Sequence, residues 1–178
     1  RQRQMCIRDS IMDDIIDLEL EKIEKIIAKI DSDPESEEVK EAEKHLWEKI
    51  YKKSGQGRRT GVGITAEGDM LAAMGLRYGT EEATEFSEQV HKTIALEAYR
   101  SSVNMAKERG AFAIYDSERE KNNPFINRLK EADPELYEEM KKYGRRNIAC
   151  LTIAPTGTTS LMTQTTSGIE TVFMPVYK

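Results

Sequence analysis

Residues 148–162 read Ile-Ala-Cys-Leu-Thr-Ile-Ala-Pro-Thr-Gly-Thr-Thr-Ser-Leu-Met, and this stretch decides the predicted fold. Its first six residues form a nearly continuous apolar run, which is typical of a strand buried on both faces. Pro155 has no N–H group and ends the run. Small hydroxyl-bearing residues follow, and Leu161 and Met162 restore the apolar character. The order predicts a buried strand, a tight turn and the start of a helix.

The turn has the composition of an anion-binding loop. From Ile153 to Glu170 the only charged residue is Glu170, although 33% of the chain is charged. The first N–H groups of a helix have no acceptor within it, and the helix dipole favours negative charge there. A glycine lets phosphate oxygens approach the backbone, and hydroxyl groups add donors. An ordinary Ser/Thr-rich helix cap is the alternative that composition leaves open. The residues predicted to contact phosphate are Thr156, Gly157, Thr158, Thr159 and Ser160, with Ala154 and Pro155 shaping the turn.

The residues just before the turn have simpler interpretations. Cys150 lies inside the predicted strand and is expected to be a small, buried core residue. Arg145 and Arg146 precede the strand and could attract a diphosphate, but a surface position at the strand entry is favoured.

Residues 11–144 are predicted to be mainly helical. The chain has an apolar residue every three or four positions from Ile16 to Ile30, which predicts one buried helical face. Asp33 and Pro34 are expected to cap and begin a second helix that packs against the first as an antiparallel hairpin. The residues predicted for these two buried faces are Ile16, Leu20, Ile23, Ile27 and Ile30, then Val39, Ala42, Leu46 and Ile50.

Two further helices are predicted, from Thr80 to Gly110 and from Asp133 to Gly144, with a polar connection over residues 122–127. His91 lies beside the apolar stripe of the first of these helices. No cysteine is near it, so a packed or surface histidine is favoured over a metal ligand, and no metal site is predicted.

The glycines of residues 55–68 fit a nucleotide-binding loop only loosely. Gly61-x-Gly63-x-x-Ala66 resembles the dinucleotide fingerprint, but no apolar strand precedes it. Close packing of the backbone, where a side chain would collide, is the favoured explanation.

Composition limits the classes of function. The net charge of −5 disfavours a duplex nucleic-acid partner, and no window is apolar enough to predict a membrane span or a signal peptide. With two cysteines, Cys6 and Cys150, no disulfide framework is expected, so a cytoplasmic location is predicted.

The ends of the chain differ from its middle. Residues 1–10 lack the apolar period and are interpreted as a non-native or misassembled segment. Residues 11–178 are predicted to be part of one domain, with a helical part over 11–144 and the strand and phosphate loop over 145–178. Because the chain stops within an apolar run, a fragment of a longer protein is expected.

Longer motifs point to a family. Five segments resemble the large catalytic chain of ribonucleotide reductases. They are RRNIACLTIAPTGTTSLMTQTTSGIETVF, GRRTGVGITAEGDMLAAMGLRYGTEEA, AYRSSVNMAKERGAFAIYD, MDDIIDLELEKI and NPFINRL. The resemblance is greatest to the adenosylcobalamin-dependent class and extends from Met12 to Tyr177. In that family APTGTxS binds the substrate phosphates. Thr171 stands where the family usually has proline, which affects the following turn rather than the loop.

The resemblance implies an α/β fold, here a fragment of a ten-stranded α/β barrel that is mostly helical with one or two short buried strands. It implies thiyl-radical reduction of ribonucleoside di- or triphosphates, with adenosylcobalamin as cofactor. The implied partners are a nucleotide effector, a thiol reductant such as thioredoxin and a second copy in a homodimer. The family's radical and redox cysteines are expected upstream of this sequence, so no catalytic residue is assigned and the chain alone is expected to be inactive. The alternatives are the metal-radical class of reductase and a non-enzymatic helical interaction module.

Overall fold

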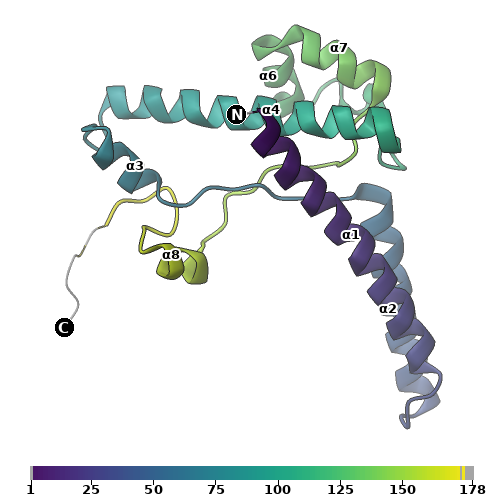
Figure 1. Ribbon diagram of the computed structural model, residues 1–178. Helices are drawn as coiled ribbons and strands as arrows, with labels where there is room; N and C mark the ends of the chain where they lie inside the picture. Colours follow the sequence, from purple (N-terminus) through teal and green to yellow (C-terminus); the bar gives the residue numbers. More distant parts are fainter. Residues whose placement is uncertain (1, 173, 175–178) are drawn as a thin grey trace. The chain divides into compact units, whose positions relative to one another are not determined.

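The computed structural model describes residues 2–172 and 174, with side chains from residue 7 onward (Figure 1). Phe173 and residues 175–178, the last part of the predicted 145–178 segment, lie outside the described residues. The described part of the chain forms eight helices. They are α1 (Gln2–Ile30), α2 (Glu37–Gly57), α3 (Glu67–Ala73), α4 (Glu81–Arg109), α5 (Ser117–Glu120), α6 (Pro124–Ala132), α7 (Pro134–Tyr143) and α8 (Gly157–Thr163).

The predicted α/β class is wrong for this chain. The described residues contain no strand and no part of a barrel, and their one β-bridge is the isolated parallel pair Val62–Leu151. Residues 148–153 are extended but do not form the expected strand buried on both faces. Cys150 is buried, Leu151 is only half-buried, and Ile153 is 66% exposed.

Residues 148–153 do not form a strand because they have too few neighbouring segments to pair with. Parallel strands are stabilised by hydrogen bonds to strands on either side and by elements covering both faces. Here the extended segment has one backbone neighbour. Ile148 N–H donates to Gly57 O at 2.9 Å, and Thr152 N–H donates to Val62 O at 3.0 Å. An apolar run without more partners than this remains an extended segment.

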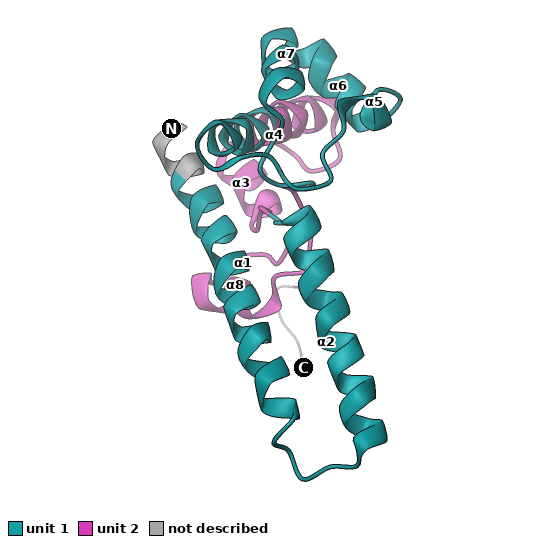
Figure 2. Ribbon diagram, turned by 90° about the vertical axis from the view of Figure 1, so that its right-hand side faces the viewer, with its two compact units in different colours: residues 1–61, 96–150 teal, residues 62–95, 151–178 magenta. Residues whose placement is uncertain are grey.

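The chain divides into two compact units (Figure 2). Unit 1 contains the residues up to Gly61 and Leu96–Cys150, and unit 2 contains Val62–Ala95 and the residues from Leu151 onward. Helix α4 is shared, since its residues 81–95 belong to unit 2 and the remainder to unit 1.

In unit 1, α1 packs against α2 as the predicted antiparallel hairpin, and the two helices run side by side in Figure 2. Ile16, Ile23 and Ile30 of α1 are buried, as their spacing predicts. The predicted face of α2 is wrong, because Val39 is 42% exposed and Leu46 is 54% exposed.

The start of α2 also differs from the prediction. Its N-cap is Ser36 rather than Asp33. The Asp33 carboxylate instead forms a salt bridge with Lys29 of α1 at 3.1 Å, which keeps Asp33 at the end of the first helix.

The connection expected over residues 122–127 contains the start of α6, where the Asn123 side chain accepts from the N–H groups of Phe125 and Ile126. The predicted Asp133 cap and Gly144 stop of α7 are confirmed.

A buried ionic network centred on Asp13 joins the segments of unit 1. The Asp13 side chain is fully buried and accepts hydrogen bonds from Arg58 Nε at 2.8 Å and Arg146 Nε at 3.0 Å. Asn147 Nδ2 donates to the same carboxylate at 3.0 Å, and Arg109 lies 3.5 Å away. Burial alone would raise the pKa of Asp13, but the hydrogen bonds and positive charges of Arg58 and Arg146 hold it below its usual value. The network ties α1 to the end of α2, to α4 and to the segment after α7.

Arg145 forms a second buried ion pair in unit 1. Its guanidinium donates to both carboxylate oxygens of Glu120 at 2.6 Å, and the side chain is 2% exposed. The rings of Phe112 and Tyr99 lie 5.3 Å and 5.6 Å from the guanidinium. The surface position predicted for Arg145 is therefore wrong, and its charge is used inside the fold.

Residues 2–10 continue α1 without a break, so residue 10 does not mark the boundary of a structural element. Asp9 is 5% exposed, and its Oδ2 has no hydrogen-bond partner among the described residues. Ile7, in contrast, is 57% exposed. The assignment of residues 1–10 to a non-native segment stays a prediction.

No helix in the described part of the chain has the length and apolar character needed to cross a membrane.

Candidate functional site

The predicted phosphate loop forms the first turn of α8 in unit 2. Thr156 is the N-cap, and its side chain makes no capping hydrogen bond to the helix. The N–H groups of Gly157, Thr158 and Thr159 occupy the first turn, where a helix provides no acceptor. No described residue elsewhere accepts from these three groups. The turn therefore presents three donors and the positive end of the helix dipole.

Gly157 lies beside open space. A Cβ atom built at this position would meet no described heavy atom within 4 Å. Gly157 is also not among the residues with positive φ, so neither its backbone conformation nor its packing requires glycine. The absence of a side chain leaves the first turn of α8 accessible to a ligand.

The hydroxyl groups of the loop fall into two sets. Thr156 Oγ1 donates to Ser167 O at 2.6 Å, and Ser160 Oγ donates to Gly157 O at 2.9 Å, so both hydroxyl groups are already hydrogen-bonded within the protein. Ser160 is buried, whereas Thr158 and Thr159 are exposed. Of the predicted hydroxyl contacts, only those of Thr158 and Thr159 are accessible, and backbone N–H groups make up most of the donor set.

The turn after α8 holds Thr156 in place. Thr156 N–H donates to Ser167 O at 3.1 Å, and the Thr156 side chain donates to the same oxygen. Thr156 Oγ1 also lies 2.9 Å from Thr65 Oγ1. The N-cap is thus anchored to residues that are distant in sequence.

A clamp on Thr166 was not predicted from the sequence. Asp69 Oδ2 accepts from Thr166 N–H at 2.7 Å and from Thr166 Oγ1 at 3.2 Å. On the other side, Thr166 O accepts from Ala66 N–H at 3.0 Å and from Thr65 Oγ1 at 2.7 Å. Asp69 in the first turn of a helix looks like an ordinary dipole partner, so nothing local in the sequence marks this contact.

Two glycines allow close backbone approaches beside the loop. A Cβ at Gly68 would lie 2.7 Å from Thr171 Cα, and one at Gly63 would lie 2.7 Å from Thr152 O. The close-packing interpretation of Gly63 is therefore confirmed. Thr171 lies directly against Gly68 of α3.

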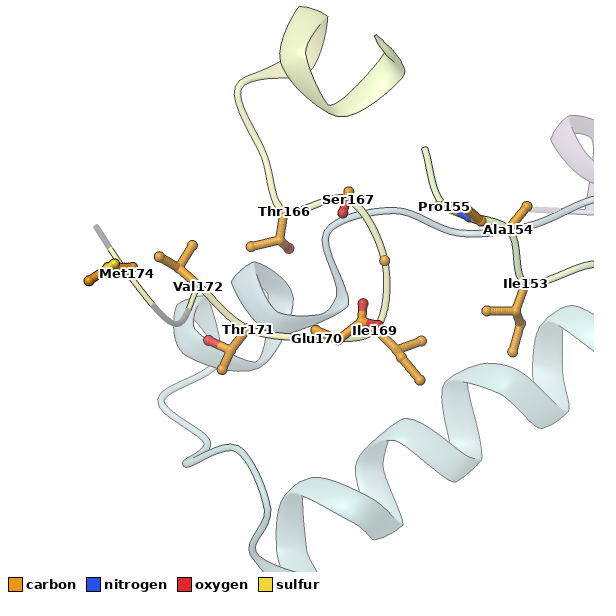
Figure 3. A pocket seen from close by; sticks show the side chains of 11 residues that line it. Ile153, Ala154, Pro155, Thr166, Ser167, Ile169, Glu170, Thr171, Val172 and Met174 are labelled. Carbon is orange, nitrogen blue, oxygen red and sulfur yellow. The ribbon is translucent and has the colours of Figure 1, made fainter. Parts of the chain in front are cut away.

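A pocket of about 790 Å³ opens next to the loop (Figure 3). Its labelled side chains come from two stretches, one with Ile153, Ala154 and Pro155 and the other from Thr166 to Met174. Ala154 and Pro155 directly precede Thr156, so the pocket begins within two residues of the α8 N-cap. The wall is mainly apolar, with the Glu170 carboxylate and the Thr and Ser hydroxyls as its polar groups.

The remaining predicted residues have structural roles. Burial raises the pKa of the Cys150 thiol to about 12, and the side chain is 2% exposed, which confirms it as a core residue. Arg146 donates to Asp13 and to the carbonyl oxygens of Arg109 and Gly110 within unit 1. His91 Nε2 lies 3.0 Å from Glu67 Oε2, and the His91 side chain is 36% exposed, so this histidine is half-buried and paired with a carboxylate.

One group of carboxylates has the spacing of a cation site. Ligand atoms of Asp13, Asp14 and Asp17 lie within 4.8 Å of one another. Each is already paired, Asp13 with Arg58 and Arg146, Asp17 with Arg58, and Asp14 with Arg109. Three guanidinium groups therefore balance the three carboxylates, and the group is an ionic network of the fold.

Comparison with known proteins identifies the family of this chain. The family model of the ribonucleotide reductase barrel domain matches residues 13–178, which include the whole predicted loop. A vitamin B12-dependent ribonucleoside-diphosphate reductase of Thermoplasma acidophilum is 35% identical over 138 residues, covering 77% of this chain and 16% of that protein. A protein of the same name from Mycobacterium tuberculosis is 34% identical over 117 residues, covering 65% of this chain and 14% of that protein. A ribonucleoside-diphosphate reductase subunit alpha of Chlamydia pneumoniae is 30% identical over 140 residues, covering 68% of this chain and 13% of that protein. The chain thus spans a small part of the length of these relatives.

Proposed function

The chain belongs to the ribonucleotide reductase barrel-domain family, and from that premise we propose that its α8 loop holds the phosphates of a ribonucleotide in an enzyme that makes deoxyribonucleotides. The observation that carries the proposal is the first turn of α8. Three N–H groups have no acceptor in the described chain, and the space beside Gly157 is open. These are the features by which helix N-termini bind phosphate.

The pocket supports a nucleotide rather than a free phosphate as the ligand. Ile153 and Pro155 give it apolar surface within three residues of the α8 N-cap. A ligand whose phosphate binds at α8 has its nucleoside within reach of that surface. The substrate class that fits both features is a ribonucleoside di- or triphosphate.

Thiyl-radical chemistry requires cysteines, and we assign that role to no described residue of this chain. Cys150 is 2% exposed, so a substrate cannot reach its sulfur, and we do not propose it as the radical or redox group. In this proposal the chain contributes substrate orientation, which can supply a large part of a catalytic barrier. The nucleotide effector, the thiol reductant and the homodimer stay predictions.

Two of the relatives described above are named as vitamin B12-dependent, and adenosylcobalamin is the cofactor that we propose for the complete enzyme. The described residues do not form a recognisable site for it. His91 Nε2 is engaged by Glu67, and His45 is exposed on α2. No step is therefore assigned to residues of this chain through the cofactor. A reductase of the metal-radical class is the second candidate, because one relative is named without vitamin B12.

A charge-insertion experiment tests the loop assignment. Gly157→Glu places a carboxylate where phosphate oxygens would lie, so pyrophosphate binding to the chain should be abolished. Thr158→Ala removes one accessible hydroxyl and should weaken binding about ten-fold, near the lower limit for a hydrogen bond to a charged group. Binding is measured by titrating pyrophosphate into isotope-labelled chain and following the amide signals of residues 157–159.

Met162→Glu is the matched control, because it adds the same charge to an α8 residue that is 82% exposed and lies beyond the first turn. It should retain most of the pyrophosphate affinity, and circular dichroism should show equal helicity in all variants. A wild-type chain with no saturable shift at residues 157–159, or a folded Gly157→Glu chain that binds normally, would refute the phosphate assignment.

A further inference from the structure

We propose that Asp69 and Thr65, on either side of the start of α3, are positioning residues for the α8 loop. The inference rests on the proposed function, because it concerns the same loop. Thr166 is held from two sides. Asp69 accepts its N–H and hydroxyl, at 2.7 Å and 3.2 Å, while Thr65 Oγ1 and Ala66 N–H donate to its carbonyl oxygen. All polar groups of Thr166 are thus bonded to the segment around the start of α3.

The clamp reaches the phosphate loop through one residue. Ser167 follows Thr166, and its carbonyl oxygen accepts both the N–H and the hydroxyl of Thr156, at 3.1 Å and 2.6 Å. Thr156 is the N-cap of α8, so its position sets the direction of the N–H groups of the next three residues. Fixing Thr166 therefore fixes the donors that are proposed to bind phosphate.

Helix α3 is itself braced. Glu67 is buried and accepts from Ser87 Oγ of α4 at 2.5 Å, while His91 Nε2 of α4 lies 3.0 Å from its other oxygen. Glu67 N–H also donates to Gly168 O at 3.2 Å. Asp69 therefore lies on a helix, α3, whose position is fixed by hydrogen bonds to α4. A preorganised binding loop needs such supporting contacts.

The carboxylate of Asp69 is the part of the clamp that can be tested most cleanly. A carboxylate accepts an N–H hydrogen bond more strongly than a neutral group does. Asp69→Ala leaves the Thr166 N–H without its acceptor. Asp69→Asn keeps a neutral acceptor of the same shape and serves as the conservative variant. The matched control is Asp116→Ala, because Asp116 likewise accepts a backbone N–H, from Glu118 at 2.9 Å, but belongs to unit 1, whereas the loop belongs to unit 2.

Two measurements are made on the chain. The first is hydrogen exchange at the Thr156 N–H without ligand, and the second is the pyrophosphate titration followed at residues 157–159. Asp69→Ala should accelerate exchange at Thr156 and weaken pyrophosphate binding, each about ten-fold. Asp69→Asn should lie between Asp69→Ala and wild type, and Asp116→Ala should match wild type in both measurements.

The outcomes separate the two proposals. If exchange at Thr156 is unchanged in Asp69→Ala, or rises equally in Asp116→Ala, Asp69 does not position the loop. If exchange rises specifically but pyrophosphate affinity is unchanged, the contact is structural and the positioning role is refuted. A wild-type chain that fails to bind pyrophosphate refutes the phosphate function, while the exchange data still decide whether Asp69 holds Thr156.

Discussion

Replacing Asp13 by asparagine should destabilise unit 1 far more than the same replacement at the adjacent Asp14. Both changes remove one negative charge and keep the side-chain shape. The Asp13 side chain is fully buried, whereas that of Asp14 is 57% exposed. Asp13 accepts from Arg58, Arg146 and Asn147 at 2.8–3.0 Å, while Asp14 has a salt bridge with Arg109 alone at 2.6 Å.

The expected magnitudes follow from burial. Removing one partner of a buried ion pair leaves uncompensated charges and costs about 3–5 kcal/mol. An exposed pair contributes about 0–1 kcal/mol. For a chain of this size the Asp13→Asn loss corresponds to a fall in Tm of about 6–20 °C, and the Asp14→Asn loss to about 4 °C at most.

Urea unfolding followed by circular dichroism measures the difference in the free energy of unfolding. The slope of that free energy against urea should be unchanged if only stability is affected. If Asp13→Asn costs no more than Asp14→Asn, Asp13 is not the centre of the network and the buried-charge argument fails.

The free energy of unfolding from the same urea assay should also depend on pH through Asp13. The folded-state pKa of Asp13 is lowered by Arg58 and Arg146, so the unfolded chain binds the proton more readily. Stability from this group is fully present above the unfolded pKa of about 3.8 and is lost as pH falls through the folded value. The advantage of wild type over Asp13→Asn should therefore begin to fall below about pH 4 and continue to fall at lower pH.

Three further outcomes are expected. Ala66 has a φ of 65°, where a side chain is strained, so Ala66→Gly should raise the free energy of unfolding by about 1 kcal/mol in the same urea assay; a loss of stability would contradict this. In a Cys6→Ser background, iodoacetamide should modify Cys150 only after unfolding, because the thiol is buried and its pKa is about 12; rapid labelling of folded chain at pH 8 would show otherwise. Deleting residues 1–10 should change Tm by less than about 2 °C, since Asp9 buries an unpaired oxygen and Ile7 is exposed; a larger fall in calorimetry would show that the segment stabilises the fold.

The sequence predicted the helices better than it predicted their surroundings. Spacing alone identified the buried isoleucines of α1, and Asp133 and Gly144 marked the ends of α7, because helix faces and caps depend on neighbouring residues. The apolar run after Asn147 did not become a strand, since a strand also needs neighbours that spacing cannot reveal.

For the candidate site as well, features set by neighbouring residues were predicted and features set by distant residues were not. The turn from Thr156 to Ser160 and the start of α8 followed from local composition. The roles of Arg145, Asp69 and Thr65 did not, because each depends on a partner between 25 and 101 residues away. A lone arginine or aspartate carries no local signal that distinguishes a buried ion pair or a clamp from a solvated charge.

The contact between Asp69 and Thr166 also constrains the order of folding. The two residues are 97 positions apart, so the contact closes a long loop whose entropy must be lost before the hydrogen bonds form. Contacts of such high sequence separation slow folding and are expected to have low φ-values in the transition state. At synthesis rates of about 5–20 residues per second, Asp69 leaves the ribosome roughly 5–20 s before its partner. The helices of the chain can form during that interval, but the α8 loop can reach its anchored geometry only once nearly the whole of this sequence has been translated.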